Sequence, residues 1–306
     1  MCRLAFTESA ATILSGVPDL MTDSPIRVGT SAFTAAGWPG TFYPRNLKPG
    51  EYLSFYATRF DAVELDNTFY ATPAVSTVTN WHAKTPPGFL FAAKVPQVIT
   101  HEKVLVGCDE DLKNFLTAMD ALREKLGPML FQFGKFKSSE FKTQGEFLVR
   151  LKPFLQKLPK DYRFAVEIRN KDWLDLRFVD LLREHGVALA LIDQSWMPRP
   201  WELKNNLDLI TADFTYVRWL GDRKGIEEKT QTWDKVIVDR QGELFEWVNL
   251  LKKVHERRIM ILAFANNHYA GNGPATVELF RSLWGPEMLS KVKEPRQTGQ
   301  QSSLFD

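Results

Sequence analysis

Eight short apolar runs divide this chain into repeating units, and their spacing constrains the fold more than any other feature. Each run has the length of a β-strand, successive runs start roughly 25 to 45 residues apart, and most intervals carry a helical pattern. The runs are nearly continuously apolar, as strands buried on both faces of a parallel sheet should be. They cover residues 26–31, 61–65, 90–95, 129–133, 164–169, 188–193, 214–220 and 259–267.

This repetition predicts β–α units, which build either a closed barrel or an open, doubly wound sheet. Eight strands close a TIM-like barrel, whereas no G-x-G-x-x-G motif follows any run to support a dinucleotide-binding sheet. We therefore expect a single (β/α)8 TIM-like barrel with long top loops. The predicted barrel spans residues 26–290, between an N-terminal extension (1–25) and a flexible polar tail (291–306).

Two glycine–proline pairs mark expected helix boundaries. The strong amphipathic pattern over residues 109–126 predicts one helix that stops at Gly127-Pro128. After the eighth run, Gly273-Pro274 predicts a helix start. In barrels, a helix N-terminus at this point often holds phosphate.

The composition narrows the class of protein but not the reaction. The 306 residues are 44% hydrophobic and 25% charged, which is typical of a globular protein. The net charge of +2 gives no global reason for binding nucleic acid, and no run is long enough to span a membrane. The two cysteines, Cys2 and Cys108, fit a reducing cytoplasm, so we expect a cytoplasmic protein without a membrane partner.

Polar residues interrupt or follow the predicted strands at their C-terminal ends. In an α/β barrel these ends surround the active site, and buried polar side chains are costly unless they pair or face a solvated cavity. We therefore predict a ligand site there, although a structural ion-pair network would give the same pattern. The set comprises Ser31, Glu64, Asn67, Lys94, Gln132, Glu167, Arg169, Asp193, Arg218, Asn266 and Asn267.

Members of this set suit different chemistry. Glu64, Glu167 and Asp193 are candidate acid/base catalysts, and their oxygens could also bind Mg²⁺ or Mn²⁺, although the sequence requires no metal. Lys94 could neutralise an anionic substrate or form a Schiff base with a carbonyl substrate. The predicted substrate-binding residues are Asn67, Tyr70, His101, Gln132, Arg169, Arg218, Asn266 and Asn267.

Six stretches read VELDNTFYATP, FAAKVPQVITH, LFQF, VEIRNKDW, YVRWLG and FANNHYAGNGPA. Together they resemble the YecE-like family, also described as domain of unknown function 72, over about residues 26–284. The resemblance implies an α/β barrel but carries over no catalytic roles, because the family has no settled activity. Leu220 stands where many relatives have a histidine before the glycine of the seventh strand.

The C-terminal peptide QSSLF resembles the short motif with which bacterial proteins bind the replication sliding clamp. Gln301, Leu304 and Phe305 match that motif, whereas Ser302 replaces the leucine of its stronger form. Because so short a motif also arises by chance, a coincidental Leu-Phe pair is an equal alternative.

These features support three hypotheses about function. The first is an enzyme acting on a phosphorylated, sugar or nucleic-acid substrate, for example a hydrolase of phosphodiester or glycosidic bonds assisted by carboxylates or a divalent metal. The second is carbonyl chemistry through a Schiff base on Lys94. The third is a non-enzymatic module that docks on the sliding clamp. A clamp-binding tail would also link the enzyme of the first hypothesis to DNA repair or replication.

Overall fold

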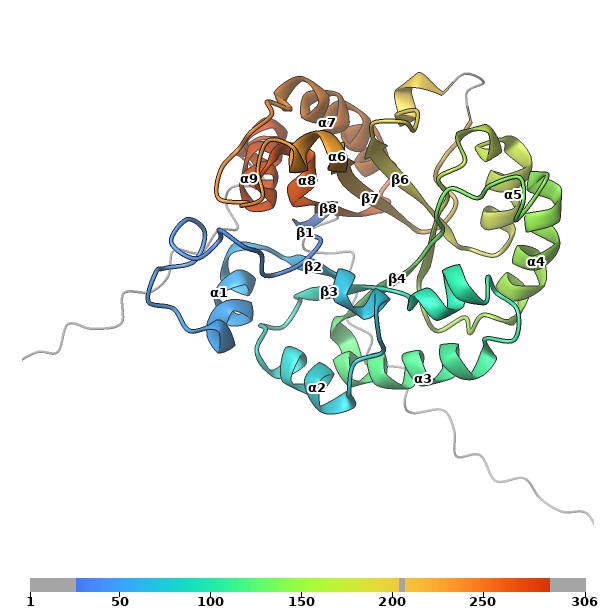
Figure 1. Ribbon diagram of the computed structural model, residues 1–306, viewed down its shortest axis with the longest axis horizontal. Helices are drawn as coiled ribbons and strands as arrows, with labels where there is room; N and C mark the ends of the chain where they lie inside the picture. Colours follow the sequence, from blue (N-terminus) through green and yellow to red (C-terminus); the bar gives the residue numbers. More distant parts are fainter. Residues whose placement is uncertain (1–25, 204–206, 287–306) are drawn as a thin grey trace, which may run out of the picture.

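Eight parallel strands form the centre of the computed structural model, and helices surround them (Figure 1). This arrangement confirms the predicted TIM-like barrel. The structure describes residues 26–203 and 207–286, so the extension and the whole predicted tail, including Gln301, Leu304 and Phe305, lie outside it. The strands are β1 (Ile26–Thr30), β2 (Ala62–Leu65), β3 (Leu90–Lys94), β4 (Leu126–Gln132), β5 (Phe164–Glu167), β6 (Ala188–Gln194), β7 (Phe214–Gly221) and β8 (Met260–Ala265).

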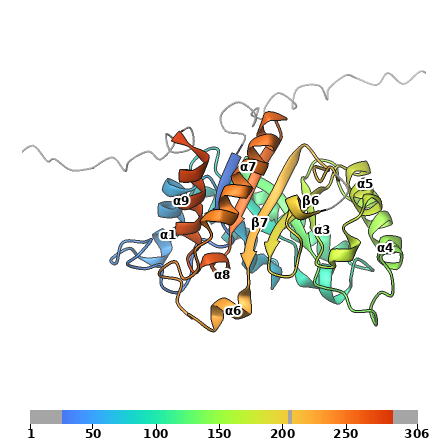
Figure 2. The same ribbon diagram turned by 90° about the horizontal axis from the view of Figure 1, so that it is seen from above.

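The helices between the strands pack on the outside of the barrel. Two short helices that the sequence pattern did not reveal, α6 and α8, lie at the same end of the molecule as the arrowhead of β7 (Figure 2). Within the two described ranges, no helix combines the length and apolar character needed to cross a membrane. The helices are α1 (Tyr52–Arg59), α2 (Val75–Ala83), α3 (Asp109–Met119), α4 (Gln144–Lys157), α5 (Leu176–Glu184), α6 (Arg223–Glu227), α7 (Gln241–Glu256), α8 (Asn267–Ala270) and α9 (Gly273–Trp284).

The two largest apolar clusters of the described residues hold the barrel together. The larger one lies between strands and helices, because alternate strand residues point outward to the helix layer. The smaller one fills the barrel interior and combines small side chains on some strands with bulky side chains on β7 and β8. Its members are Ala62, Leu90, Ala92, Leu130, Ala165, Ala188, Ala190, Phe214, Tyr216, Met260, Leu262 and Phe264. Residues further along the same strand faces therefore line the C-terminal mouth of the barrel.

A tyrosine side chain joins β1 to β2. The backbone ladder of the described chain runs from β1 through β8 and round to β2, and leaves this one seam unpaired. At the seam, the Thr30 amide donates to the Tyr56 hydroxyl at 2.8 Å, and that hydroxyl lies 3.2 Å from the carbonyl oxygen of Ala62. A Cβ atom on Gly29 would lie 1.8 Å from the same oxygen, so only glycine permits the close approach of the two strands.

The prediction of one helix over residues 109–126 is wrong at its C-terminal end. α3 ends at Met119, a 3-10 segment follows over Asp120–Lys125, and Leu126 already begins β4. Gly127 therefore lies within a strand, where a Cβ atom would come within 3.1 Å of the Phe91 carbonyl oxygen. Gly127 therefore allows the backbones of β3 and β4 to approach closely, and it does not end a helix.

Candidate functional site

Arg218 of β7 is the centre of a buried ion-pair network at the mouth of the barrel. Its Nε and Nη2 donate to Glu64 Oε1 at 3.1 and 2.7 Å, and its Nη1 donates to Glu167 Oε2 at 2.6 Å. Nη2 also lies 3.3 Å from Asp66 Oδ1, and the Tyr216 hydroxyl donates to Glu64 Oε2 at 2.6 Å. The network thus joins the ends of β2, β5 and β7, which the sequence predicted to meet.

The two glutamates are completely buried but differ in their electrostatic surroundings. Burial raises the pKa of Glu64; Arg218 opposes this shift and Asp66 adds to it. Burial would also raise the pKa of Glu167, but the charges of Arg169 and Arg218 outweigh it and lower that pKa to about 2. Glu167 is therefore the firmly ionised carboxylate of the network.

Lys94, at the end of β3, is only loosely paired. Its Nζ lies 3.6 Å from Asp66 Oδ1 and 3.9 Å from the centre of the Phe69 ring. Burial lowers the pKa of Lys94; Asp66 opposes this shift, and Arg218 adds to it. The Thr68 hydroxyl donates to the carbonyl oxygen of Lys94 at 2.6 Å, which fixes the 3-10 segment Asp66–Phe69 beside β3.

Three further predicted residues stand on the β3–β5 side of the mouth. Arg169 donates through Nε to Glu167 Oε1 at 2.7 Å, and its other N–H groups make no hydrogen bond with the described chain. Gln132, which faces Glu167 in the ladder, is buried. His101 is exposed; the partial burial of its ring and the charges of Lys94 and Arg169 lower its pKa.

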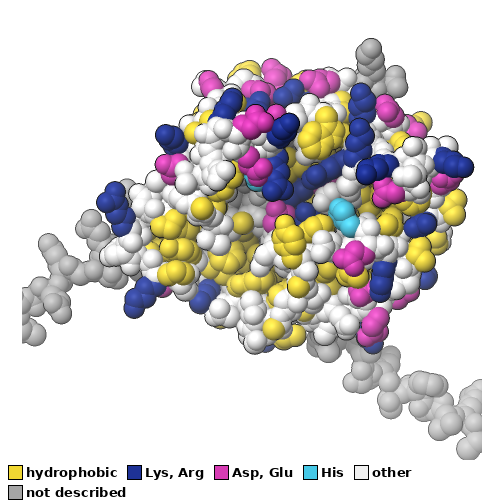
Figure 3. Space-filling model, in the orientation of Figure 1, with side chains coloured by type: hydrophobic (Ala, Val, Ile, Leu, Met, Phe, Trp, Pro, Cys, Tyr) yellow, Lys and Arg dark blue, Asp and Glu magenta, His cyan; other side chains and the backbone are white. Residues whose placement is uncertain are grey.

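The rim above these groups carries aromatic side chains. Phe69 contacts both Tyr70 and His101 edge-on, with ring centres 5.4 and 5.0 Å apart. Tyr70 is 74% exposed and Asn67 is also exposed, so both stand at the outer edge of the site. On this face of the molecule, acidic and basic side chains gather around a central hollow (Figure 3).

Asp193 is not brought together with the two glutamates. Its carboxylate turns to the helix layer, where it accepts hydrogen bonds from Trp247 Nε1 at 2.8 Å and the Tyr269 hydroxyl at 3.0 Å. Arg199 Nε completes its surroundings at 3.2 Å. These contacts join β6 to α7 and α8. The role of Asp193 is therefore to hold these elements together.

The N-terminus of α9, a predicted phosphate site, is already capped by side chains. Asn267 Oδ1 accepts the backbone N–H of Gly273 at 2.8 Å and the Trp38 indole N–H at 3.2 Å. Asn272 Oδ1 accepts the N–H of Ala275 at 2.8 Å. The predicted helix start is confirmed, but its first donors already have partners.

Asn266 connects β8 to the neighbouring loops. Its Nδ2 donates to Ser31 Oγ at 2.9 Å, and its Oδ1 accepts the backbone N–H of His268 at 2.9 Å. His268 Nε2 in turn lies 3.0 Å from Glu227 Oε1 on α6. Ser31 and Asn266 therefore support the loops on the β8 side of the mouth.

The carboxylates do not converge on one point as a metal site would require. Glu64 and Glu167 direct their oxygens at Arg218, Arg169 and Tyr216, and Asp193 faces the helix layer. Over residues 26–203 and 207–286, no group of three or more His, Cys, Asp or Glu side chains could hold a metal ion. The described carboxylates therefore do not fit a Mg²⁺ or Mn²⁺ site.

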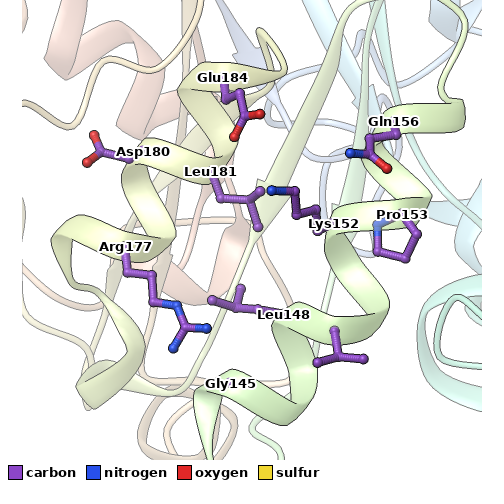
Figure 4. Close-up of a pocket in the computed structure, with 10 residues that line it drawn as sticks. Gly145, Leu148, Lys152, Pro153, Gln156, Arg177, Asp180, Leu181 and Glu184 are labelled. Atoms are coloured by element: carbon purple, nitrogen blue, oxygen red, sulfur yellow. The ribbon is translucent and has the colours of Figure 1, made fainter.

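A separate groove of about 600 Å³ lies on the outside of the barrel, between α4 and α5 (Figure 4). Leu148 and Leu181 contribute apolar surface, and Lys152, Arg177 and Glu184 bring charges to it. None of the predicted site residues lines this groove. The charge network at the barrel mouth, and not the groove, is the candidate functional site.

Sequence reasoning missed the roles of two residues in the network. Asp66 directly follows β2 and is the most accessible of its three carboxylates, with a side chain that is 32% exposed. Its position at the end of a predicted strand was the available signal. Tyr216 lies within a continuously apolar run, so nothing in the sequence distinguished it from a core aromatic.

Comparisons with known proteins agree with this architecture. The UPF0759 protein YecE of Escherichia coli (strain K12) is 27% identical over 297 residues, which cover 88% of this chain and 98% of YecE. The UPF0759 protein YunF of Bacillus subtilis (strain 168) is 24% identical over 265 residues, covering 79% of this chain and 92% of YunF.

A crystal structure of a DUF72 family protein from Thermotoga maritima has a similar fold. It superposes with a TM-score of 0.64 at 28% identity, covering 84% of this chain and 98% of that protein. The family model described as "Protein of unknown function DUF72" matches residues 27–301. The resemblance found in the six sequence stretches is therefore confirmed, and the chain belongs to the DUF72 family.

Proposed function

We propose that this protein is an enzyme whose barrel mouth binds a phosphate-bearing substrate, either a sugar phosphate or a nucleic-acid fragment. The observation that carries the proposal is the unequal pairing of three cations. Arg218 is held by two buried carboxylates, whereas Lys94 has its nearest carboxylate oxygen at 3.6 Å and Arg169 uses only its Nε–H. Lys94 and Arg169 therefore keep donors available for an anion.

These two cations suit a phosphate group in complementary ways. A lysine ammonium is a compact point charge, whereas an arginine guanidinium offers a planar pair of N–H groups for bidentate contact. Both lie beside a buried network, where charge-assisted hydrogen bonds are stronger than in water. The side chain of Lys94 is 11% exposed and that of Arg169 is 22% exposed, so a ligand at the mouth can reach both.

Proton transfer in such an enzyme falls to Asp66 in this proposal. Glu64 and Glu167 have no exposed surface, so a substrate at the mouth does not touch them. Their role is to position Arg218. Asp66 lies beside both Lys94 and Arg218, and it is accessible enough to meet a substrate hydroxyl or water.

The test measures binding of inorganic phosphate, ribose 5-phosphate and adenosine monophosphate to the full chain by calorimetry. We expect Lys94→Met and Arg169→Gln each to weaken phosphate-ester binding about tenfold or more, as loss of a charged hydrogen bond does. Asp66→Asn should keep binding but lose any turnover found with these substrates.

The outer groove supplies matched controls for these variants. Lys152→Met and Arg177→Gln remove the same charges from exposed positions on α4 and α5, so they should bind like the wild type. Equal binding by the wild type, Lys94→Met and Arg169→Gln would refute the proposed anion site.

A second candidate, Schiff-base chemistry, is favoured by the lowered pKa of Lys94. Burial beside the Phe69 ring holds more of this amine in the neutral, nucleophilic form. Borohydride reduction with pyruvate or glyceraldehyde 3-phosphate should then label Lys94, as seen by peptide mass spectrometry. A Lys94→Arg variant that still binds phosphate but cannot be labelled separates the two functions, and an unlabelled wild type counts against this candidate.

A further inference from the structure

Gln132, at the end of β4, is a largely buried residue whose side-chain amide is not used within the described part of the chain. It is 4% exposed, and its side chain makes no hydrogen bond to any residue that the structure describes. Its neighbours contrast with it. Glu167, opposite it in the ladder, accepts from Arg169 and Arg218, and the adjacent strand β3 carries Lys94. The amide oxygen and nitrogen of Gln132 are not among the described side-chain atoms that are shut off from solvent without a partner, so both can be reached by a ligand at the mouth.

A second amide repeats the pattern across β5. Gln194, at the end of β6, is 7% exposed, and its Oε1 is buried without a hydrogen-bond partner in the described chain. Two amides with unused hydrogen-bonding capacity thus flank the strand that carries Glu167 and leads into Arg169. An amide carries no net charge, so it adds no long-range attraction for an anion. It does offer both a donor and an acceptor, which is what a hydroxyl group needs.

We propose that Gln132 is a specificity-determining residue that hydrogen-bonds a hydroxyl group of the substrate, next to the phosphate held by Lys94 and Arg169. This inference rests on the proposed function and narrows its substrate class to hydroxyl-bearing phosphate esters, that is, sugar phosphates. A site built to hydrogen-bond a substrate hydroxyl rejects an analogue that lacks it, because the site's own polar group is then left unpaired.

The test compares sugar phosphates with analogues that lack one hydroxyl. The probes are ribose 5-phosphate with 2-deoxyribose 5-phosphate, glucose 6-phosphate with 2-deoxyglucose 6-phosphate, and inorganic phosphate alone, titrated into the full chain. We expect the wild type to prefer the hydroxylated member of at least one pair by about tenfold. Gln132→Met, which keeps the shape but not the polar atoms, should lower that ratio to about one and leave phosphate binding within about twofold.

Two readouts separate specificity from a structural role. Gln156→Met, the same change at an exposed position on α4, should keep the full preference. Gln132→Met should unfold at the same temperature as the wild type or higher, because the amide that it removes makes no hydrogen bond within the described part of the chain. A structural role would instead lower the unfolding temperature.

The outcomes also distinguish this inference from the proposed function. If phosphate binds and depends on Lys94, but the wild type shows no preference in either pair, or Gln132→Met keeps the preference, then the role of Gln132 is overturned and the anion site stands. If no probe binds more tightly to the wild type than to Lys94→Met, the proposed function fails and this inference fails with it.

Discussion

Glu167 accepts its hydrogen bond from Arg218 at 2.6 Å and has no exposed surface. Its pKa, lowered from 4.5 to about 2, links its ionisation to folding. A depressed carboxylate pKa contributes stability that is fully present above the unfolded value and is lost as the pH falls through the folded value. This residue alone thus contributes on the order of 3 kcal/mol, lost between about pH 4.5 and pH 2.

We predict that Glu167→Gln lowers the free energy of unfolding at pH 7 by about 3 to 5 kcal/mol, because Arg218 and Arg169 lose a buried counter-charge. The variant should also lose less stability than the wild type between pH 4.5 and pH 2. Urea unfolding over this pH range measures both effects. Glu184→Gln, at an exposed position on α5, is the control and should follow the wild-type profile. Parallel acid profiles for Glu167→Gln and the wild type would contradict the prediction.

The residues of the site show what a sequence can and cannot predict. The C-terminal ends of the strands can be predicted from the apolar runs. The sequence therefore predicts that Glu64, Lys94, Glu167 and Arg218 meet at the barrel mouth. The direction of a side chain is not readable when both faces of a strand are buried, because no alternation of polar and apolar residues marks the inner face. The sequence pattern groups Asp193 with the glutamates for this reason, whereas its side chain faces the helix layer.

At the scale of the elements, the contact between β1 and β2 depends on two residues, Gly29 and Tyr56. We predict that Gly29→Ala destabilises the barrel by about 3 kcal/mol or more, because its Cβ would overlap the Ala62 carbonyl oxygen at 1.8 Å. Tyr56→Phe should cost about 1 to 3 kcal/mol, because the Thr30 amide loses its acceptor. Thermal and urea unfolding measure both losses.

Gly50→Ala is the control for the seam. No atom lies within 4 Å of a Cβ built there, so the substitution should change stability by less than about 1 kcal/mol. If Gly29→Ala were as stable as Gly50→Ala, the close approach of β1 and β2 would not exist in solution.

The elements also explain the partial success of the fold prediction. Long apolar runs and amphipathic helices gave the eight strands and most helices, because burial alone determines those patterns. The sequence predicts a helix stop at Gly127 because glycine occurs both in turns and in tight contacts between strands, and the sequence alone does not distinguish the two. The seam residue Tyr56 was beyond prediction, because its contacts with Thr30 and Ala62 depend on the closed barrel.

For the whole molecule, the C-terminal peptide and the barrel mouth are predicted to act independently. We expect the full chain to bind a bacterial sliding clamp and a chain lacking residues 301–306 not to bind it, as measured by surface plasmon resonance. Phosphate binding at the mouth should be equal in both chains. Leu304→Ala combined with Phe305→Ala serves as a control for the deletion and should abolish clamp binding as well. Clamp binding that survives both changes, or is absent from the full chain, would reject the motif.

The hydrogen-bond ladder between β1 and β8 joins two strands that are synthesised far apart in time. Ile26 pairs with Ile261, so β1, the first of the described strands, meets its ladder partner β8 only after 235 further residues (261 − 26) have been made. At synthesis rates of about 5 to 20 residues per second, roughly 12 to 47 s separate the two strands. By the end of that interval seven of the described strands have been made, and β1 still lacks its partner β8. The ladder of the described strands therefore reaches β1 only once β8 has been synthesised.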